Sequence, residues 1–314
     1  MTSLIESRNL SKHYPSRDGK TIVRAVNGVN LALAQGQTLG IVGESGCGKS
    51  TLARLMLRLI KPTAGEVLFN GENLHALSEQ AMRQRRRDIQ IVFQDPYASL
   101  DPRMSVSAII SEPLEIHHIG TRAERSAKVL ELLDLVGLDR NAAVKYPHEF
   151  SGGQRQRIGI ARAIALEPKL VVLDEPVSAL DISIQSQILN LLIDLKKRLN
   201  LSYIFISHDL SVVEHVSDDV AVMYLGRIVE YGAAMKVLGT PLHPYTQALV
   251  SAMPEMDVAK KKQRIVLSGD PPNPEDIPSG CPFHPRCQHA MAICGETLPE
   301  LFLTQDRNVA CHLY

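Results

Sequence analysis

The clearest chemistry in the sequence lies in the stretch GESGCGKST, which has the spacing G-x-x-x-x-G-K-S of a phosphate-binding loop. Glycines allow backbone N–H groups to turn inward around phosphate oxygens, and a helix that follows adds the positive end of its dipole. The lysine of such a loop reaches the terminal phosphates of a nucleotide, and the serine hydroxyl can ligate Mg²⁺. The residues expected to bind are Gly43, Glu44, Ser45, Gly46, Cys47, Gly48, Lys49, Ser50 and Thr51.

A second candidate group consists of acids that follow a short apolar run. Residues 170–173 are all apolar and precede Asp174 and Glu175, which predicts a buried parallel strand with carboxylates at its C-terminal edge. In a phosphate-loop fold an acid there organises Mg²⁺, and the next carboxylate can take a proton from the attacking water. A later apolar run ends at His208, where an imidazole could hydrogen-bond a γ-phosphate. The alternatives are a solvent-facing acidic pair and a purely structural histidine.

The elements around these residues must place them at one edge of a sheet. Residues 39–42 predict a buried strand and residues 52–57 a helix, so the glycine-rich loop has the strand–loop–helix context that it needs. A glycine-rich turn that binds nothing is the alternative, but both flanks and all fixed positions fit a phosphate loop. Residues 3–42 predict a small antiparallel sheet, and residues 103–147 predict a helical insert.

A second glycine-rich helix start follows the insert. Ser151, a plausible N-cap, opens an amphipathic helix and makes this a second possible phosphate site, although the motif alone could simply cap a helix. Residues 184–199 predict a further helix, and residues 220–231 predict a hairpin around Leu225 and Gly226. The residues of the glycine-rich start are Ser151, Gly152, Gly153 and Gln154.

Composition limits the classes of function. Lysine and arginine total 34, as do aspartate and glutamate, and this balance argues against nucleic acid as the main partner. The sequence has no run of about 18 apolar residues and no signal-peptide core, so we expect a soluble, cytoplasmic protein that meets membranes only through partner proteins.

Taken in order, these motifs resemble the nucleotide-binding subunit of ABC transporters. The resemblance covers roughly residues 3–240. The aromatic residue of the A-loop corresponds to Tyr14, which would stack on adenine. Walker A corresponds to Gly43–Thr51, and the Q-loop corresponds to Gln94, which would touch Mg²⁺ and link to the helical insert.

The later motifs continue the same series. The family signature corresponds to Ser151–Gln154, Walker B to Leu170–Asp174 and the D-loop to Ser178–Asp181. Glu175 takes the place of the catalytic glutamate and His208 that of the switch histidine. The resemblance therefore implies an intact, hydrolysing ATP site, with Ser50, Gln94 and Asp174 as the residues that hold Mg²⁺.

The resemblance also implies a fold and an assembly. The expected fold is α/β, a P-loop NTPase with a RecA-like core, an N-terminal antiparallel β subdomain and a helical signature subdomain at about residues 95–165. Two such subunits would pack head to tail, with each ATP between one phosphate loop and the partner's signature. The partners would be a second, different ATPase subunit, two transmembrane permease subunits and an extracytoplasmic solute-binding protein, at the cytoplasmic face of the inner membrane, with no nucleic acid.

The end of the chain resembles one subfamily. Residues 241–314, with the sequence PLHPYTQALVSAMP near their start, are similar to the C-terminal extension of the oligopeptide, dipeptide and nickel importers, beyond an ATPase domain of residues 1–240. Residues 92–104, VFQDPYASLDPRM, resemble the second ATPase of such pairs. The expected function is ATP-driven import of di- or oligopeptides. Nickel or glutathione import, a non-transport ABC ATPase and a non-hydrolysing regulator are the alternatives.

Four of the five cysteines lie in this extension. Their gaps, C-x5-C-x6-C-x16-C, lack the close C-x2-4-C pair that is usual in zinc sites, whereas irregular gaps can hold an iron–sulfur cluster. The subfamily resemblance implies the same [4Fe–4S] cluster. Zinc, with His284 or His312 as further ligands, and reduced thiols without metal stay open as alternatives. The cysteines in question are Cys281, Cys287, Cys294 and Cys311.

Overall fold

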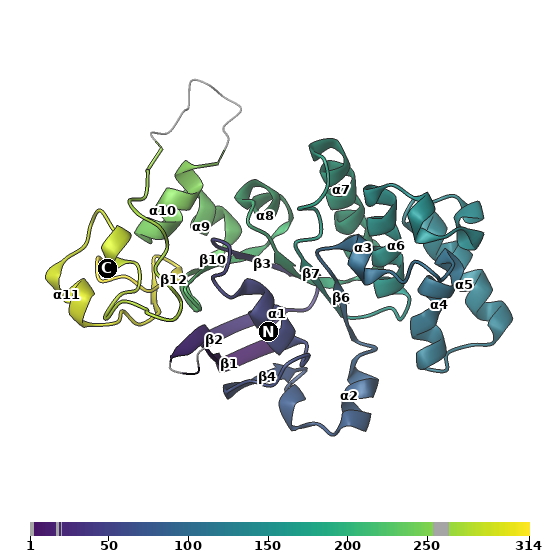
Figure 1. Ribbon diagram of the computed structural model, residues 1–314, viewed down its shortest axis with the longest axis horizontal. Coiled ribbons are helices and arrows are strands. Elements are labelled where there is room, and N and C mark those ends of the chain that lie inside the picture. The colour runs from purple at the N-terminus through teal and green to yellow at the C-terminus, as the bar shows by residue number, and fades with distance from the viewer. Residues whose placement is uncertain (1–2, 17–18, 20, 254–263) are drawn as a thin grey trace. The chain divides into compact units, whose positions relative to one another are not determined.

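The computed structural model describes residues 3–16, 19, 21–253 and 264–314. The chain divides into two compact units (Figure 1). The first unit comprises Met1–Ala76 and Phe205–Tyr314, and the second comprises Leu77–Ile204. In the described part of the chain, no helix combines the length and the apolar character that crossing a membrane requires.

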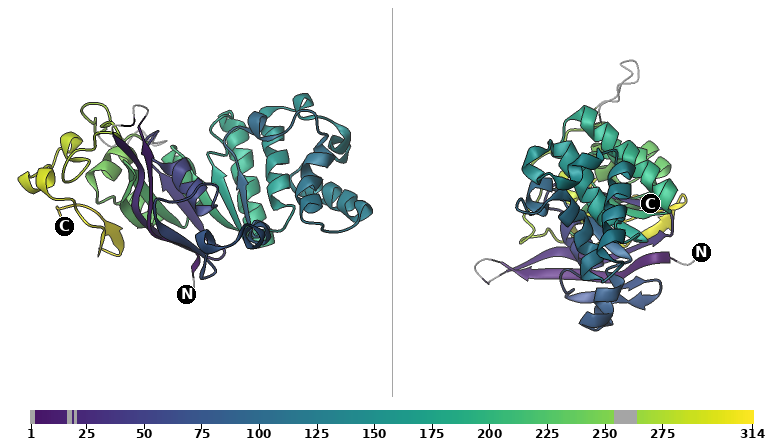
Figure 2. Two further views of the ribbon diagram at one scale, coloured as in Figure 1. Left: turned by 60° about the horizontal axis from the view of Figure 1, so that its bottom comes forward. Right: turned by 90° about the vertical axis from the view of Figure 1, so that its right-hand side faces the viewer.

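The first unit begins with an antiparallel sheet, as the sequence predicts. Strands β1 (Ser3–Pro15), β2 (Ile22–Ala34), β4 (Ala64–Phe69) and β5 (Glu72–Asn73) follow the order β2-β1-β4-β5. Figure 2 shows β1 and β2 as a long twisted ribbon. Along β2, buried Val29, Leu31 and Leu33 alternate with exposed residues, because successive side chains of a strand point to opposite faces.

The other sheet of the first unit carries the phosphate loop. Strand β3 (Thr38–Val42) pairs in parallel with β9 (Asp219–Tyr224), so the prediction that residues 3–42 form one antiparallel sheet is wrong at its end. All of β3 is buried, as is usual for a parallel strand covered on both faces. The predicted hairpin is confirmed: β9 pairs with β10 (Arg227–Ala233), and Leu225 and Gly226 have φ of 42° and 80°, which suits a tight two-residue turn.

The C-terminal extension adds to this same sheet. Strand β12 (Arg307–Val309) pairs antiparallel with β10 and with β11 (Phe302–Thr304). The sequence indicates no strand here, because each of these strands is only three residues long. The helices of the first unit are α1 (Lys49–Met56), α8 (Leu210–Val216), α9 (Ala234–Gly239), α10 (Pro244–Ser251) and α11 (Ala292–Glu296).

The second unit combines a parallel strand pair with helices. Strand β6 (Ile89–Val92) pairs in parallel with β7 (Leu170–Asp174), and the division between the units falls within β8 (Ser202–Ile206). The helices that the sequence predicts over 103–147 are present, and the helix expected from residue 184 begins at Ile182. They are α2 (Glu79–Arg85), α3 (Pro96–Ser99), α4 (Val106–Ile116), α5 (Arg122–Leu135), α6 (Gly152–Ile164) and α7 (Ile182–Leu199).

Candidate functional site

The phosphate loop of the first unit needs glycine at two of its fixed positions. Gly43 has a φ of 151°, and a Cβ there would lie 2.1 Å from the carbonyl oxygen of Met223. Gly48, the N-cap of α1, has a φ of 109°, and its Cβ would lie 2.0 Å from the carbonyl oxygen of Ala25. Both obstacles are backbone atoms, which cannot move to make room for a side chain. The positions of β2 and β9 therefore determine the path of the loop.

Lys49 is held inside this loop. Its side chain is only 5% exposed, and its ammonium donates to the carbonyl oxygens of Gly43 (2.8 Å) and Glu44 (2.9 Å). Because an ammonium carries three protons, it can keep these contacts and still donate to a phosphate oxygen. Ser50 and Thr51 follow on the first turn of α1, as the sequence predicts for a Mg²⁺ ligand and its neighbour.

Cys47 lies buried in the same loop, with 4% of its surface exposed. Burial raises the pKa of its thiol, against a smaller lowering by the charge of Lys49. A buried thiol with a raised pKa is a poor nucleophile. Cys47 therefore has the character of a packing residue.

The loop also has partners that lie far away in the sequence. Arg286, in the extension, donates to both carboxylate oxygens of Glu44 at 2.9 and 3.1 Å. The Tyr245 hydroxyl accepts the N–H of Glu44 at 2.9 Å. Since these partners lie 242 and 201 positions away, no local spacing could have revealed them.

Two more predicted residues belong to the first unit. Tyr14 lies near the end of β1 and is 37% exposed, with the Lys12 ammonium 5.0 Å from its ring centre. His208 is exposed and lies in the short connection between β8 and α8. The helix after it is capped by Asp209, whose carboxylate accepts the N–H of Ser211 at 2.9 Å, so the backbone beside the imidazole is fixed.

In the second unit, two predicted catalytic residues meet at the end of β7. Asp174 is the last residue of the strand and is 7% exposed, and Glu175 follows with a φ of 48°, a left-handed conformation that is uncommon for residues other than glycine. The Gln94 amide donates to the Glu175 carboxylate at 2.8 Å. The sequence predicted these side chains separately, and the structure shows that one orients the other.

The glycine-rich helix start is also formed as predicted. The Ser151 hydroxyl accepts the Gln154 N–H at 3.4 Å, and the Gln154 side chain accepts the Ser151 N–H at 3.0 Å, which is a complete capping box. Gly153 packs so closely that a Cβ there would lie 2.4 Å from Cγ2 of Ile184 in α7. Asp181, at the N-cap of that helix, is exposed.

The four late cysteines give a mixed result. The Cys294 sulfur accepts the Met291 N–H at 3.5 Å. For Cys281, Cys287 and Cys311, burial raises the pKa of the thiol, and the backbone N–H groups of Phe283, His289 and Leu313 respectively offset part of that rise. Burial, with a smaller contribution from the other three thiols, raises the pKa of Cys281 to about 11. The thiols are thus close enough to affect one another. Nevertheless, in the described ranges no group of three or more His, Cys, Asp or Glu side chains is arranged to hold a metal ion.

Two models of known protein families match separate parts of the chain. A family model described as ABC transporter matches residues 26–178. A second model, described as Oligopeptide/dipeptide transporter, C-terminal region, matches residues 229–294. The first match contains the phosphate loop, Gln94 and the Asp174–Glu175 pair, and the second contains Arg286 and three of the four late cysteines.

The sequences of known relatives are similar to this chain over almost its whole length. The Oligopeptide transport ATP-binding protein AppF of Bacillus subtilis (strain 168) is 52% identical over 99% of this chain and 98% of its own length. The Di/tripeptide transport ATP-binding protein DppF of Pseudomonas aeruginosa (strain UCBPP-PA14) is 50% identical over 99% and 98%.

Solved structures with the same fold include cbiO1 from Clostridium perfringens, with a TM-score of 0.67 and 30% identity over 76% of this chain and 92% of that chain. The ATP-binding cassette MJ0796, in a dimer bound to ADP and Pi, has a TM-score of 0.67 and 30% identity over 73% and 98%. The chain therefore belongs to the ABC transporter family, as an ATP-binding protein with the oligopeptide/dipeptide transporter C-terminal region.

Proposed function

We propose that this protein is the ATP-hydrolysing subunit of an importer of di- or oligopeptides. The observation that carries the hydrolytic part is the Gln94–Glu175 hydrogen bond of 2.8 Å beside the buried Asp174. A carboxylate held by a neutral amide keeps its negative charge and its direction, which a general base for water needs. The peptide substrate is supported by the names of the relatives, which transport oligopeptides and di- or tripeptides.

The main predicted residues have distinct roles in this proposal. Lys49 and the loop N–H groups bind the phosphates, and Tyr14 stacks on the base. Glu175 takes a proton from the attacking water, and His208 contacts the γ-phosphate. Since phosphoryl transfer depends mostly on positioning and charge stabilisation, the packed glycines matter as much as the charged groups. The Mg²⁺ ligands of the proposal are Ser50, Gln94 and Asp174.

We further propose that two such subunits enclose ATP between them. Dimeric cassettes among the solved relatives support this arrangement. In it, Ser151, Gly152, Gly153 and Gln154 face the γ-phosphate held by the partner, and Asp181 lies at the contact. The exposed start of α6 supports this role, because its N–H groups and helix dipole favour an anion.

The proposed membrane partners are two permeases, and the proposed location is the cytoplasmic face of the membrane. A hollow of about 580 Å³ in the second unit supports a docking role. Its lining includes Phe93 and Ile116, which are 41% and 47% exposed, together with Arg83, Glu112 and Arg162. Exposed apolar side chains with charges around them are typical of protein-binding surfaces. Phe93 directly precedes Gln94, so this hollow adjoins the residue that orients the catalytic carboxylate.

The four late cysteines are proposed to hold the [4Fe–4S] cluster that the subfamily resemblance implies. The support is the mutual influence of the thiols and the backbone N–H groups beside them, since N–H donors stabilise thiolate charge. Such a cluster would pin the proline-rich extension. Anaerobically purified protein should contain iron and sulfide in equal amounts, whereas a colourless zinc-loaded sample would contradict the proposal.

The test of the function is phosphate release by the complex assembled with its permeases and binding protein. Oligopeptides should stimulate release, while nickel or reduced glutathione should not. Stimulation by nickel or glutathione alone would move the protein to the alternative importer class. A Lys49→Ala variant, which loses the phosphate contact, should release no phosphate above background.

A further inference from the structure

The C-terminal extension reaches back to the phosphate loop through Arg286. This residue ends a short helical turn, His284–Arg286, in the first unit. Its guanidinium lies in a fork against Glu44, with N–O distances of 2.9 and 3.1 Å, and also contacts the Tyr224 hydroxyl at 3.5 Å. The Arg286 side chain is only 7% exposed and that of Glu44 is 27% exposed. A two-pronged ion pair at this degree of burial fixes geometry as well as charge.

A second contact from the extension fixes the backbone of the same loop residue. The Tyr245 hydroxyl accepts the Glu44 N–H at 2.9 Å. Tyr245 is completely buried and packs against Tyr224 and Phe283, with ring centres 4.6 and 5.4 Å away. Since Phe283 lies just before the turn that carries Arg286, a single aromatic cluster supports both contacts.

Glu44 connects these two contacts to the phosphate-binding lysine. Its carbonyl oxygen accepts the Lys49 ammonium at 2.9 Å and the Cys47 N–H at 3.3 Å. Its side chain meets Arg286, its N–H meets Tyr245 and its carbonyl meets Lys49. Any shift of Glu44 therefore moves the groups that contact phosphate.

The negative charge of Glu44 gives a second reason why its side chain needs a cationic partner. A carboxylate inside a phosphate-binding loop repels the phosphates of a nucleotide, and the repulsion grows where water is partly excluded. A guanidinium on that carboxylate cancels most of the charge. We propose that Arg286 is a positioning residue of the nucleotide site, which neutralises Glu44 and fixes the phosphate loop in its binding conformation. The proposal rests on the function assigned to residues 43–51.

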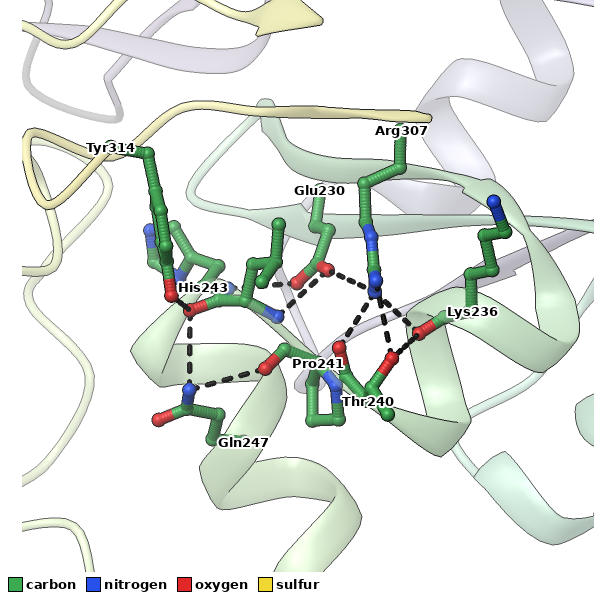
Figure 3. A network of polar contacts seen from close by, with 9 residues as sticks. Glu230, Lys236, Thr240, Pro241, His243, Gln247, Arg307 and Tyr314 are labelled. Carbon is green, nitrogen blue, oxygen red and sulfur yellow. Dashed lines mark hydrogen bonds and ion pairs between the residues drawn. The ribbon is translucent and has the colours of Figure 1, made fainter. Parts of the chain in front are cut away.

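The extension also contains a residue that can serve as a control for effects on fold stability alone. Arg307, 4% exposed, bonds the carbonyl oxygen of Thr240 at 2.7 Å and pairs with the fully buried Glu230 at 3.5 Å (Figure 3). Arg307 also donates to the carbonyl oxygen of Lys236. This network holds the extension to β10 and contacts no residue of the phosphate loop among those that the structure describes. Its loss should destabilise the fold at least as much as loss of Arg286, because it leaves a buried carboxylate unpaired.

The experiment measures the dissociation constant of the full chain for the Mg²⁺ complex of a non-hydrolysable ATP analogue. Arg286→Met should weaken binding about tenfold, the factor that corresponds to about 1.4 kcal/mol. Arg286→Lys, which keeps the charge but loses the fork, should weaken it about threefold. The double variant Glu44→Gln with Arg286→Met should bind about threefold more weakly than the unchanged chain, and so more tightly than Arg286→Met alone, because it lacks the fork but has no lone carboxylate.

Ionic strength gives an independent readout. The defect of Arg286→Met relative to the unchanged chain should shrink between low and high salt, since salt screens an unpaired charge. The Arg307→Met control should lower the midpoint of thermal unfolding but leave the dissociation constant within about twofold.

Three outcomes would overturn the positioning role: binding by Arg286→Met that matches the unchanged chain, a double variant as weak as Arg286→Met alone, or an equal weakening by Arg307→Met. Normal binding by Lys49→Ala would instead refute the assignment of the loop itself. The two failures are therefore distinguishable in one series of proteins.

Discussion

Gly153 provides a quantitative test of how α6 and α7 are packed. In a Gly153→Ala variant the new Cβ would start 2.4 Å from Cγ2 of Ile184 and must reach at least 3.0 Å, a displacement of about 0.6 Å. The obstacle is a branch next to the backbone of α7, so it cannot rotate away freely. Overpacking of this kind costs about 1–3 kcal/mol, while replacing glycine in a helix returns about 0.5–1 kcal/mol. We therefore expect a net loss of about 1 kcal/mol in the free energy of unfolding.

Another glycine of the same helix gives the control. A Cβ built on Gly159 meets no atom of the described residues within 4 Å. Gly159→Ala should therefore stabilise the protein by about 0.5–1 kcal/mol, because only the helix preference changes. Urea unfolding of both variants should give shifts of opposite sign.

The steric cause can be removed directly. In an Ile184→Ala background the nearest side-chain atom to the new Cβ is the Cβ of residue 184, at an ordinary 3.8 Å. Adding Gly153→Ala to that background should then be neutral or stabilising. Phosphate release by Gly153→Ala should fall as well, since the start of α6 would be displaced. If Gly153→Ala were as stabilising as Gly159→Ala in the native background, the packing described for α6 and α7 would be wrong.

Three further predictions follow from other sites. Gln94→Ala should lower kcat about fivefold with KM for ATP nearly unchanged, because it releases the Glu175 carboxylate; an increase in KM alone, in steady-state phosphate release, would contradict this role. Burial lowers the pKa of His243 from 6.5 to about 3, so its contribution to stability is present above pH 6.5 and is lost as the pH falls toward 3. Between pH 7.5 and pH 5.0, the free energy of unfolding should fall by about 2 kcal/mol more in the unchanged chain than in His243→Gln. Equal decreases for the two proteins in urea unfolding would refute this. Because burial raises the pKa of the Cys47 thiol, its alkylation, followed by mass spectrometry of the peptide, should be slow at pH 7, faster at pH 9 and slower again with ATP; rapid labelling at pH 7 would contradict its burial.

Local spacing was sufficient for several parts of the site. The glycine pattern predicts the loop between β3 and α1, and Ser151 as an N-cap predicts the start of α6. The apolar run before Asp174 predicts β7, and Leu225 with Gly226 predicts the turn of a hairpin. Each of these features is determined by residues within a few positions of one another, so the sequence carries a visible pattern.

Features built from distant residues left no such pattern. Glu44 and Arg286 are 242 positions apart, and either residue alone resembles an ordinary surface charge. Strand β3 was assigned to the wrong kind of sheet because its partner β9 lies far along the chain. Strand β12 was missed for the same reason, since it pairs with the distant β10, and β11, which pairs with β12, is only three residues long. Long-range pairing is determined by the whole fold, which one segment does not reveal.

The most direct test of the central claim is a comparison of ATP binding and ATP turnover in Glu175→Gln. The substitution keeps the shape of the side chain and removes the group that takes the proton from water. The complex carrying Glu175→Gln should bind ATP within about twofold of the unchanged complex and release phosphate at least about a hundredfold more slowly. Phosphate release at the unchanged rate, with ATP bound normally, would contradict the role of Glu175 as the base.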